Sequence, residues 1–152
     1  MREEWNHESS LDFGLLGSPP HAGVARLVSE LNRIYRSERA LFELDQRPDG
    51  FAWVDVENAD DSVLSFERRA RSGERILAVF NFTPVVRRGY RVGVPQEGYW
   101  REILNTNASD FGGTGEGNWG GRNAEPVGAH GRRWSLALTL PPLAALFFRS
   151  PG

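Results

Sequence analysis

The sequence contains no cysteine, a single methionine and only three histidines. Without cysteine it can form no disulfide, no thiolate nucleophile and no cysteine-based zinc site, which fits a reducing compartment. His7, His21 and His130 lie far apart, and no two of them have the i, i+4 spacing of a helical metal site. We therefore expect no metal centre.

The sequence also lacks a surplus of positive charge and a long apolar run. It has 18 basic and 20 acidic residues, with a formal net charge of -2. A nucleic-acid-binding protein needs clustered positive charge to neutralise phosphates, and a membrane span needs ~20 apolar residues. The N-terminal residues 1–5 open no apolar run of the kind that a signal peptide contains. We expect no nucleic-acid partner, no membrane association and a cytoplasmic location.

The length of 152 residues predicts one domain, or one domain with a short appendage. Residues 1–21 are rich in turn-forming residues and predict an irregular lead-in. An amphipathic helix is predicted over residues 22–36, and Ser37 and Glu38 could cap a second short helix that ends at Leu44. The apolar stripe of the first helix is formed by Val24, Leu27, Val28, Leu31, Ile34 and Tyr35.

After the turn signal at residues 47–50, the hydrophobic period falls from 3.6 to 2. Seven short β-type runs follow at 51–56, 62–69, 75–83, 85–94, 99–105, 134–140 and 143–149. Short strands separated by turns are typical of an antiparallel β-sandwich or barrel, of which we predict the sandwich. We therefore predict a mainly β protein, with a helical segment over 1–45 and an all-β domain over 46–152 that has no helix longer than one or two turns.

A long loop over residues 106–133 interrupts the β pattern, and six of the ten residues from Gly112 to Gly121 are glycine. A loop of this length is usually functional or disordered. Its segment Gly115–Gly120 matches the dinucleotide fingerprint G-x-G-x-x-G, but the residues that follow cannot open an apolar-periodic helix. We therefore expect no dinucleotide cofactor.

Five tryptophans are candidates for packing or binding. Trp53, Trp100 and Trp134 lie in β-type runs and are predicted to pack in the core or between elements. Trp119 is surrounded by glycines, and an exposed indole beside Asn and Arg donors could stack on the apolar face of a sugar ring. Carboxylates are plentiful, but no spacing selects the pair that a glycosidase-type reaction needs.

Several segments along the chain carry a family resemblance. They are Arg2–His7 with Ser10–Asp12, His21–Val28, Asn81–Val85, Tyr90–Pro95, Trp100–Thr106, His130–Arg132 and Leu138–Ala144. In this order they resemble the C-terminal end of bacterial 1,4-α-glucan (glycogen) branching enzymes of the α-amylase superfamily. Two positions depart from that pattern: Phe13 stands where the family commonly has Trp, and Trp119 interrupts a Gly-Asn-Gly-Gly segment.

The resemblance implies that residues 1–45 close a catalytic (β/α)₈ barrel and that residues 46–152 form the all-β domain that packs against it. The catalytic aspartates and glutamate of the family match no position in this chain, so no catalytic residue is assigned. The family uses no metal or organic cofactor for its chemistry. Trp5, Asn6 and His7 fall on a loop expected at the rim of the cleft, and with Trp119 they are the candidate glucan contacts.

The leading hypothesis is a non-catalytic C-terminal domain of a branching enzyme involved in glycogen biosynthesis, which supports the barrel and contacts α-glucan. Such a domain would be inactive alone, because the full-length enzyme performs the α-1,4 to α-1,6 chain transfer. The alternative is an independent carbohydrate-binding module that uses the 106–123 loop. The helix over residues 22–36 either docks on the β domain or exposes its stripe. We favour the second arrangement and expect self-association of the isolated chain.

Overall fold

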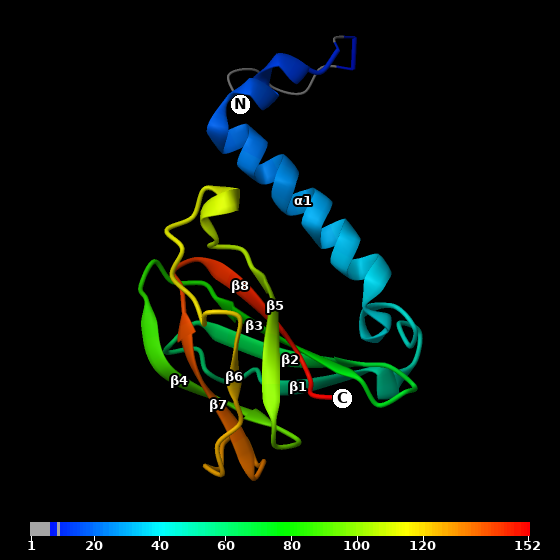
Figure 1. Cartoon of the computed structure of the whole chain (residues 1–152), viewed down its shortest axis with the longest axis vertical. Coiled ribbons are helices and arrows are strands. Elements are labelled where there is room, and N and C mark those ends of the chain that lie inside the picture. The colour runs from blue at the N-terminus through cyan, green and yellow to red at the C-terminus, as the bar shows by residue number, and fades with distance from the viewer. Residues whose placement is uncertain (1–6, 9) are drawn as a thin grey trace.

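The computed structural model describes residues 7, 8 and 10–152, in which the α-helix precedes both sheets (Figure 1). The 19-residue helix α1 spans Pro19–Ser37. It begins three residues earlier than predicted because Pro19 and Pro20 occupy its first turn, where a missing N–H costs nothing. The lead-in contains a 3₁₀ helix, η1 (Phe13–Gly17), in which Asp12 accepts a hydrogen bond from the Gly14 N–H.

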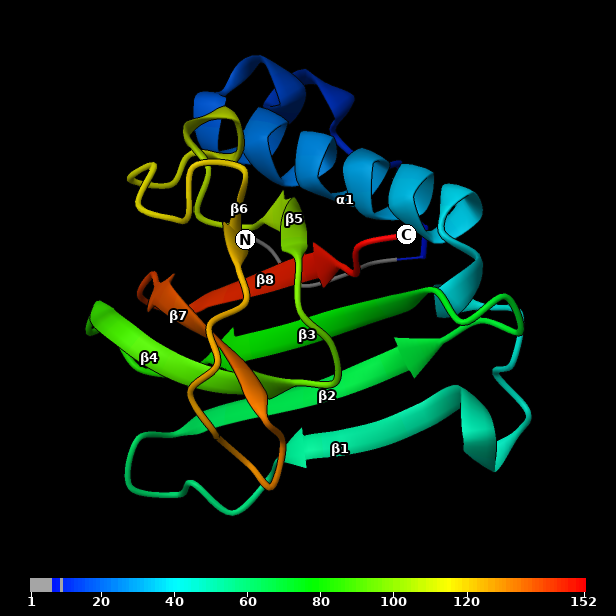
Figure 2. The ribbon, with the colours of Figure 1, turned by 60° about the horizontal axis from the view of Figure 1, so that its bottom comes forward.

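The predicted second helix is only a single 3₁₀ turn, η2 (Arg39–Leu41), and a third such turn, η3 (Pro48–Gly50), leads into the first strand. A six-stranded antiparallel sheet has the order β1-β2-β3-β8-β5-β6, and β4 pairs with β7 in a second sheet (Figure 2). The strands are β1 (Phe51–Asp55), β2 (Val63–Arg69), β3 (Arg75–Asn81), β4 (Arg87–Val94), β5 (Tyr99–Asn105), β6 (Gly121–Asn123), β7 (Trp134–Leu140) and β8 (Ala144–Arg149). This arrangement confirms the mainly β, antiparallel prediction.

The core lies between the two sheets, because alternate side chains of each strand point inward. Trp100 and Phe148 of the large sheet are fully buried, as are Val92 and Leu136 of the small one. The prediction for Trp100 is therefore confirmed, and Trp134 is half-buried beside the Arg133 guanidinium. Trp53, in contrast, lies on the outer face of the large sheet and is 52% exposed, so it does not pack in the core, and its ring contacts Phe51 and Phe66 instead.

The outer face of the large sheet carries apolar side chains of its own. At one end, Ala40 of η2 covers Ala70 and Ile76, with Ile103 and Phe147 packed around them. A row of aromatic rings continues across the uncovered part of this face, with neighbouring ring centroids 4.9 to 6.3 Å apart. Its members are Phe51, Trp53, Phe66, Phe80, Phe82 and Phe147.

Helix α1 contacts the β domain near its N-terminal half and leaves most of its apolar stripe uncovered. The Arg26 Nε donates to the Asp110 carbonyl oxygen at 2.7 Å, next to the 3₁₀ turn η4 (Ser109–Phe111). Ile34 is buried and Leu27 is half-buried, but four other stripe residues are 36 to 61% exposed. These are Val24, Val28, Leu31 and Tyr35.

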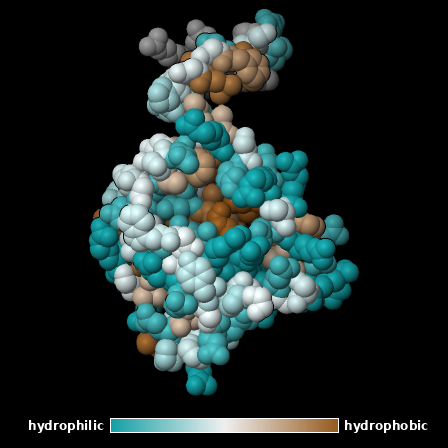
Figure 3. Space-filling model, in the orientation of Figure 1, coloured by the Kyte–Doolittle hydropathy of each residue, from teal (hydrophilic) through white to brown (hydrophobic). Residues whose placement is uncertain are grey.

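The lead-in adds further apolar surface, because Leu11, Phe13, Leu15 and Leu16 are all exposed. Figure 3 shows one hydrophobic area over this N-terminal helical segment and another in the middle of the β domain. In the part of the chain that the structure describes, no helix has the length and apolarity needed to span a membrane. The exposed stripe agrees with the sequence analysis, while self-association stays a prediction.

Candidate functional site

Trp119 lies in the loop between β5 and β6, and its side chain is 91% exposed. Its backbone has a φ of +54°, in the left-handed region that residues with a side chain seldom adopt. The residues on either side of it are Asn118 and Gly120, so no apolar neighbour in the sequence offers to cover the indole. The structure therefore presents this aromatic ring to solvent in a constrained conformation.

Buried asparagine side chains hold the loop in place. Asn118 has no exposed surface, and its Nδ2 donates to Glu102 Oε2 at 2.9 Å and to the Thr139 carbonyl oxygen at 3.0 Å. Its Oδ1 accepts the Thr139 N–H at 2.9 Å. Asn118 thus ties the residue before Trp119 to both β5 and β7.

Two further asparagines fix the start of the same loop. Asn105 Nδ2 donates to the Glu116 carbonyl oxygen at 2.8 Å, and Asn107 Nδ2 donates to Thr114 Oγ1 at 2.7 Å. The sequence left open whether this loop is functional or disordered, and these contacts, with those of Asn118, give it an ordered conformation. The loop is held by side-chain hydrogen bonds and ends in a short strand, β6, that the glycine-rich pattern concealed.

The charged groups around the loop are mostly paired. Burial raises the pKa of the Glu102 carboxyl, although the Asn118 amide and the charge of Arg122 oppose that shift. Arg88 Nη2 lies 2.7 Å from Glu116 Oε1, and Arg122 Nη1 donates to the Asn118 carbonyl oxygen at 2.8 Å. The ion pair and the Arg122 hydrogen bond therefore hold charged side chains against the loop.

A second exposed aromatic residue, Tyr99, lies against the backbone that follows Trp119. Tyr99 is 47% exposed, and its hydroxyl end packs on the backbone of Gly120 and Gly121, where a Cβ at Gly121 would come within 2.7 Å of it. Tyr99 pairs with Asn123 in the β5–β6 ladder, and the exposed Arg101 pairs with Gly121. We call Trp119, Tyr99, Arg101 and Asn123 the Trp119 platform.

His7, the one other predicted glucan contact that the structure describes, lies in the N-terminal lead-in and not in the loop before β6. Trp5 and Asn6 lie outside the described residues. His7 is exposed in a turn, with its Nε2 4.0 Å from Glu8 Oε1. The described N-terminal segment lies beyond the outer end of α1, whereas the loop before β6 belongs to the β domain (Figure 1). The Gly115–Gly120 segment leads into a strand and not into a helix.

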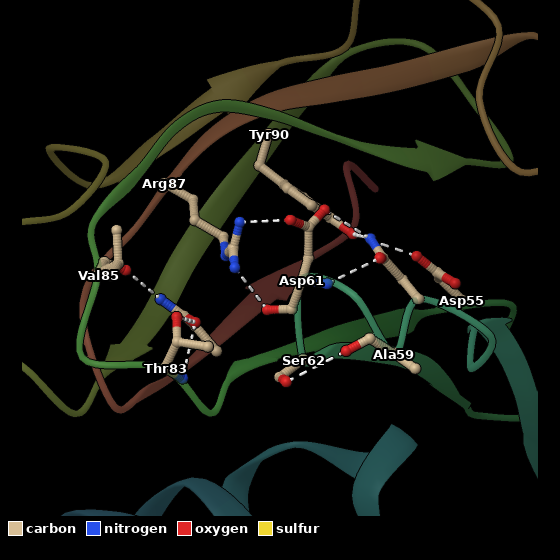
Figure 4. Close-up of polar contacts among 10 residues, drawn as sticks. Asp55, Ala59, Asp61, Ser62, Thr83, Val85, Arg87 and Tyr90 are labelled. Carbon is tan, nitrogen blue, oxygen red and sulfur yellow. Dashed lines mark hydrogen bonds and ion pairs between the residues drawn. The ribbon is translucent and has the colours of Figure 1, made fainter.

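A separate polar cluster closes the end of the sandwich between the β1–β2 turn and β4 (Figure 4). Tyr90 Oη donates to Asp55 Oδ2 at 3.2 Å and accepts from Asn58 Nδ2 at 2.6 Å. The Arg87 guanidinium pairs with the Asp61 carboxylate and donates to its carbonyl oxygen at 2.7 Å. Burial raises the pKa of the Tyr90 hydroxyl. Because these groups already bind one another, the cluster holds the turn in place.

His130 joins the same cluster from the long loop. Its Nε2 lies 3.4 Å from Asp55 Oδ2, and its Nδ1 accepts the Gly93 N–H at 3.2 Å. Both ring nitrogens therefore have partners within the cluster. Sequence reasoning did not find this cluster, because its members are separated by up to 75 positions and share no motif.

The comparisons with known proteins agree with the architecture. Residues 53–150 match the family described as the alpha amylase C-terminal all-beta domain. The 1,4-alpha-glucan branching enzyme of Aquifex aeolicus is 54% identical over 151 residues, which are 99% of this chain and 24% of the relative. The corresponding enzyme of Cereibacter sphaeroides is 55% identical over 147 residues, 97% of this chain and 20% of the relative.

The 1,4-alpha-glucan branching enzyme of Aromatoleum aromaticum is 51% identical over 147 residues, 97% of this chain and 23% of the relative. The chain thus spans about a fifth to a quarter of the length of the curated relatives it matches. The strand-rich part described above coincides with the matched residues 53–150, which are well over half of the sequence. The chain therefore belongs to the alpha-amylase C-terminal all-beta domain family.

Proposed function

We propose that the chain is the non-catalytic C-terminal part of a 1,4-α-glucan branching enzyme and that it supports the catalytic barrel of that enzyme. The observation that carries this proposal is the uncovered apolar stripe of α1, in a chain that spans at most 24% of the relatives named above. An apolar surface of this kind marks a contact with another body. In the relatives, the matched segment is joined to a longer chain, and we propose that the corresponding part of the enzyme covers the stripe.

The energetics support a role in docking. Each side chain of the stripe contributes about 1.5–3 kcal/mol when it is fully buried, and four of the six are largely exposed in the isolated chain. The exposed apolar residues of the lead-in lie in or just before η1, which contacts α1, and they add to the apolar surface left uncovered. Docking would therefore stabilise both the helix and the body that covers it.

The ion pairs of two carboxylates, Glu67 and Asp61, support a non-catalytic role. The buried Glu67 is surrounded by the guanidinium groups of Arg69, Arg75 and Arg132, and Asp61 is paired with Arg87. A two-carboxylate displacement needs one group to attack and another to donate a proton across an open cleft. Carboxylates that are already neutralised by arginines are poorly suited to either task.

A chimera tests the proposal. We expect the Aquifex aeolicus enzyme with its matched segment replaced by this chain to form new α-1,6 links in amylose, and the isolated chain to form none. Leu27→Glu with Leu31→Glu should lower the activity and melting temperature of the chimera, because both charges fall on the docking stripe. Ser29→Glu with Asn32→Glu, on the exposed polar side of the same helix, is the matched control.

Two results would contradict the proposal. One is branching by the purified isolated chain above a control without protein. The other is a Leu27→Glu, Leu31→Glu chimera that is as active and as stable as the Ser29→Glu, Asn32→Glu control. The first result would show that the chain is an enzyme by itself. The second would show that the stripe of α1 does not contact the catalytic barrel.

The exposure of Trp119 favours a second candidate function, an independent carbohydrate-binding module that uses the 106–123 loop. Affinity electrophoresis of the isolated chain in gels that contain glycogen separates the two candidates. Retardation by glycogen, together with a chimera that is insensitive to the α1 variants, would support the module. A chimera that depends on the stripe supports the docked domain, whether or not the chain also binds glucan.

A further inference from the structure

We propose that the Trp119 platform is a surface site that binds an α-1,4-glucan chain. The class of ligand rests on the proposed function, because the relatives act on 1,4-α-glucan. The location of the site rests on the structure alone. In this chain Trp119 and Tyr99 would each stack on the apolar C–H face of a glucose ring, while Arg101 and Asn123 would bind its hydroxyl groups.

The first argument is the conformation of Trp119. A left-handed backbone is unfavourable for a residue with a Cβ, and such residues persist where their surroundings hold them. The surroundings here are the three hydrogen bonds of the buried Asn118 side chain. The indole itself, at 91% exposure, contributes little packing to the fold in return. An unfavourable conformation that presents an aromatic ring to solvent is better explained by binding than by stability.

The second argument is rigidity. A flat aromatic ring on an ordered backbone loses little conformational freedom when a ligand stacks on it, and such preorganisation improves affinity. Asn105, Asn107 and Asn118 fix the loop from its start to the residue before Trp119. Gly120 and Gly121 allow the Tyr99 ring to lie against the loop backbone, where a side chain at Gly121 would collide with it. The hydroxyl end of Tyr99 is therefore held against Gly120, the residue that follows Trp119.

The third argument is the size and polarity of the surface. A stable protein interface buries about 800 Å² on each partner around an apolar centre. The surroundings of Trp119 are glycine, asparagine and arginine, which offer no such centre. A sugar ring needs only one aromatic face and a few polar groups at its edge. The platform therefore fits a glucan better than it fits a protein partner.

The experiment measures maltoheptaose binding to the full 152-residue chain by titration calorimetry and tryptophan fluorescence. Trp119→Gly removes the indole and suits the left-handed backbone, so we expect an unchanged or higher melting temperature and an affinity lower by about tenfold or more. Tyr99→Ala should also weaken binding. The matched control is Leu143→Gly, which removes an apolar side chain that is 69% exposed at a φ of +49°. This control should keep the affinity of the original chain.

Three outcomes overturn the proposal: no binding of maltoheptaose by the original chain, equal affinities for Trp119→Gly and Leu143→Gly, or equal binding of the β-1,4-linked cellohexaose. A Trp119→Gly chimera with the Aquifex aeolicus enzyme that loses thermal stability also overturns it, because Trp119 would then contact protein. None of these results depends on the α1 variants. The glucan site and the docking role can therefore fail separately.

Discussion

Glu102 illustrates how burial of one residue makes the stability of the loop depend on pH. Burial raises its pKa above the ordinary value of 4.5, so the protonated carboxyl is favoured in the folded state. The contribution of this group to the stability of the folded state is therefore complete below pH 4.5, and it is lost as the pH rises through the raised folded-state pKa. Ionisation of Glu102 therefore costs the fold stability.

We therefore expect Glu102→Gln to increase the free energy of unfolding at pH 7, because its neutral amide oxygen can still accept a hydrogen bond from Asn118. The gain over the original chain should shrink as the pH falls and disappear below pH 4.5. Urea denaturation at a series of pH values measures this difference. A gain that is the same at every pH, or a loss at pH 7, would contradict the assigned role of burial.

At this scale the sequence predicts some side-chain environments better than others. The exposure of Trp119 follows from its glycine neighbours. The exposure of Trp53 cannot be predicted in this way. An alternating pattern shows that a strand has two faces, but it does not show which face is covered. The buried Glu67 is equally hard to predict, since Arg132, which pairs with it, is 65 positions away.

At the scale of elements, the contact between α1 and η4 depends on the absence of one side chain. A Cβ at Gly23 would lie 2.5 Å from the Phe111 carbonyl oxygen, and this backbone atom cannot move aside as the end of a side chain can. The Arg26 hydrogen bond to Asp110 lies one turn further along the helix. Gly23 therefore permits the closest approach between the helix and the β domain.

We predict that Gly23→Ala separates α1 from η4 and makes the helix more accessible to protease, although alanine itself favours a helix. Gly17→Ala is the matched control, because a Cβ at that position meets nothing within 4 Å. Limited proteolysis and amide hydrogen exchange of residues 19–37 measure the change. Equal protection of the helix in both variants would show that the close approach does not hold α1.

The sequence predicts long periodic elements well and short ones poorly. The predicted helix and all seven predicted strands have counterparts in the structure, because a sustained period of 3.6 or 2 selects one burial pattern. Strand β6 has only three residues and contains glycine, so it has no period to detect. Its pairing with β5 depends on a contact that no local pattern encodes.

At the scale of the whole molecule, the uncovered stripe of α1 predicts association between copies of the isolated chain. We expect sedimentation velocity to show an increase in mean mass with concentration. Leu27→Glu with Leu31→Glu should shift the chain toward monomer with little change in melting temperature, since neither side chain is fully buried. A monomeric original chain, combined with a double variant that melts much earlier, would show that the helix is docked on its own β domain.

The position of β8 determines the order in which the large sheet can form. This strand lies between β3 and β5, yet it follows every other strand in the sequence. Synthesis proceeds at about 5–20 residues per second, so several seconds separate the translation of β3 from that of β8. Throughout that time the growing chain exposes an unpaired strand edge beside apolar side chains, which is the kind of surface that nascent chains present to chaperones.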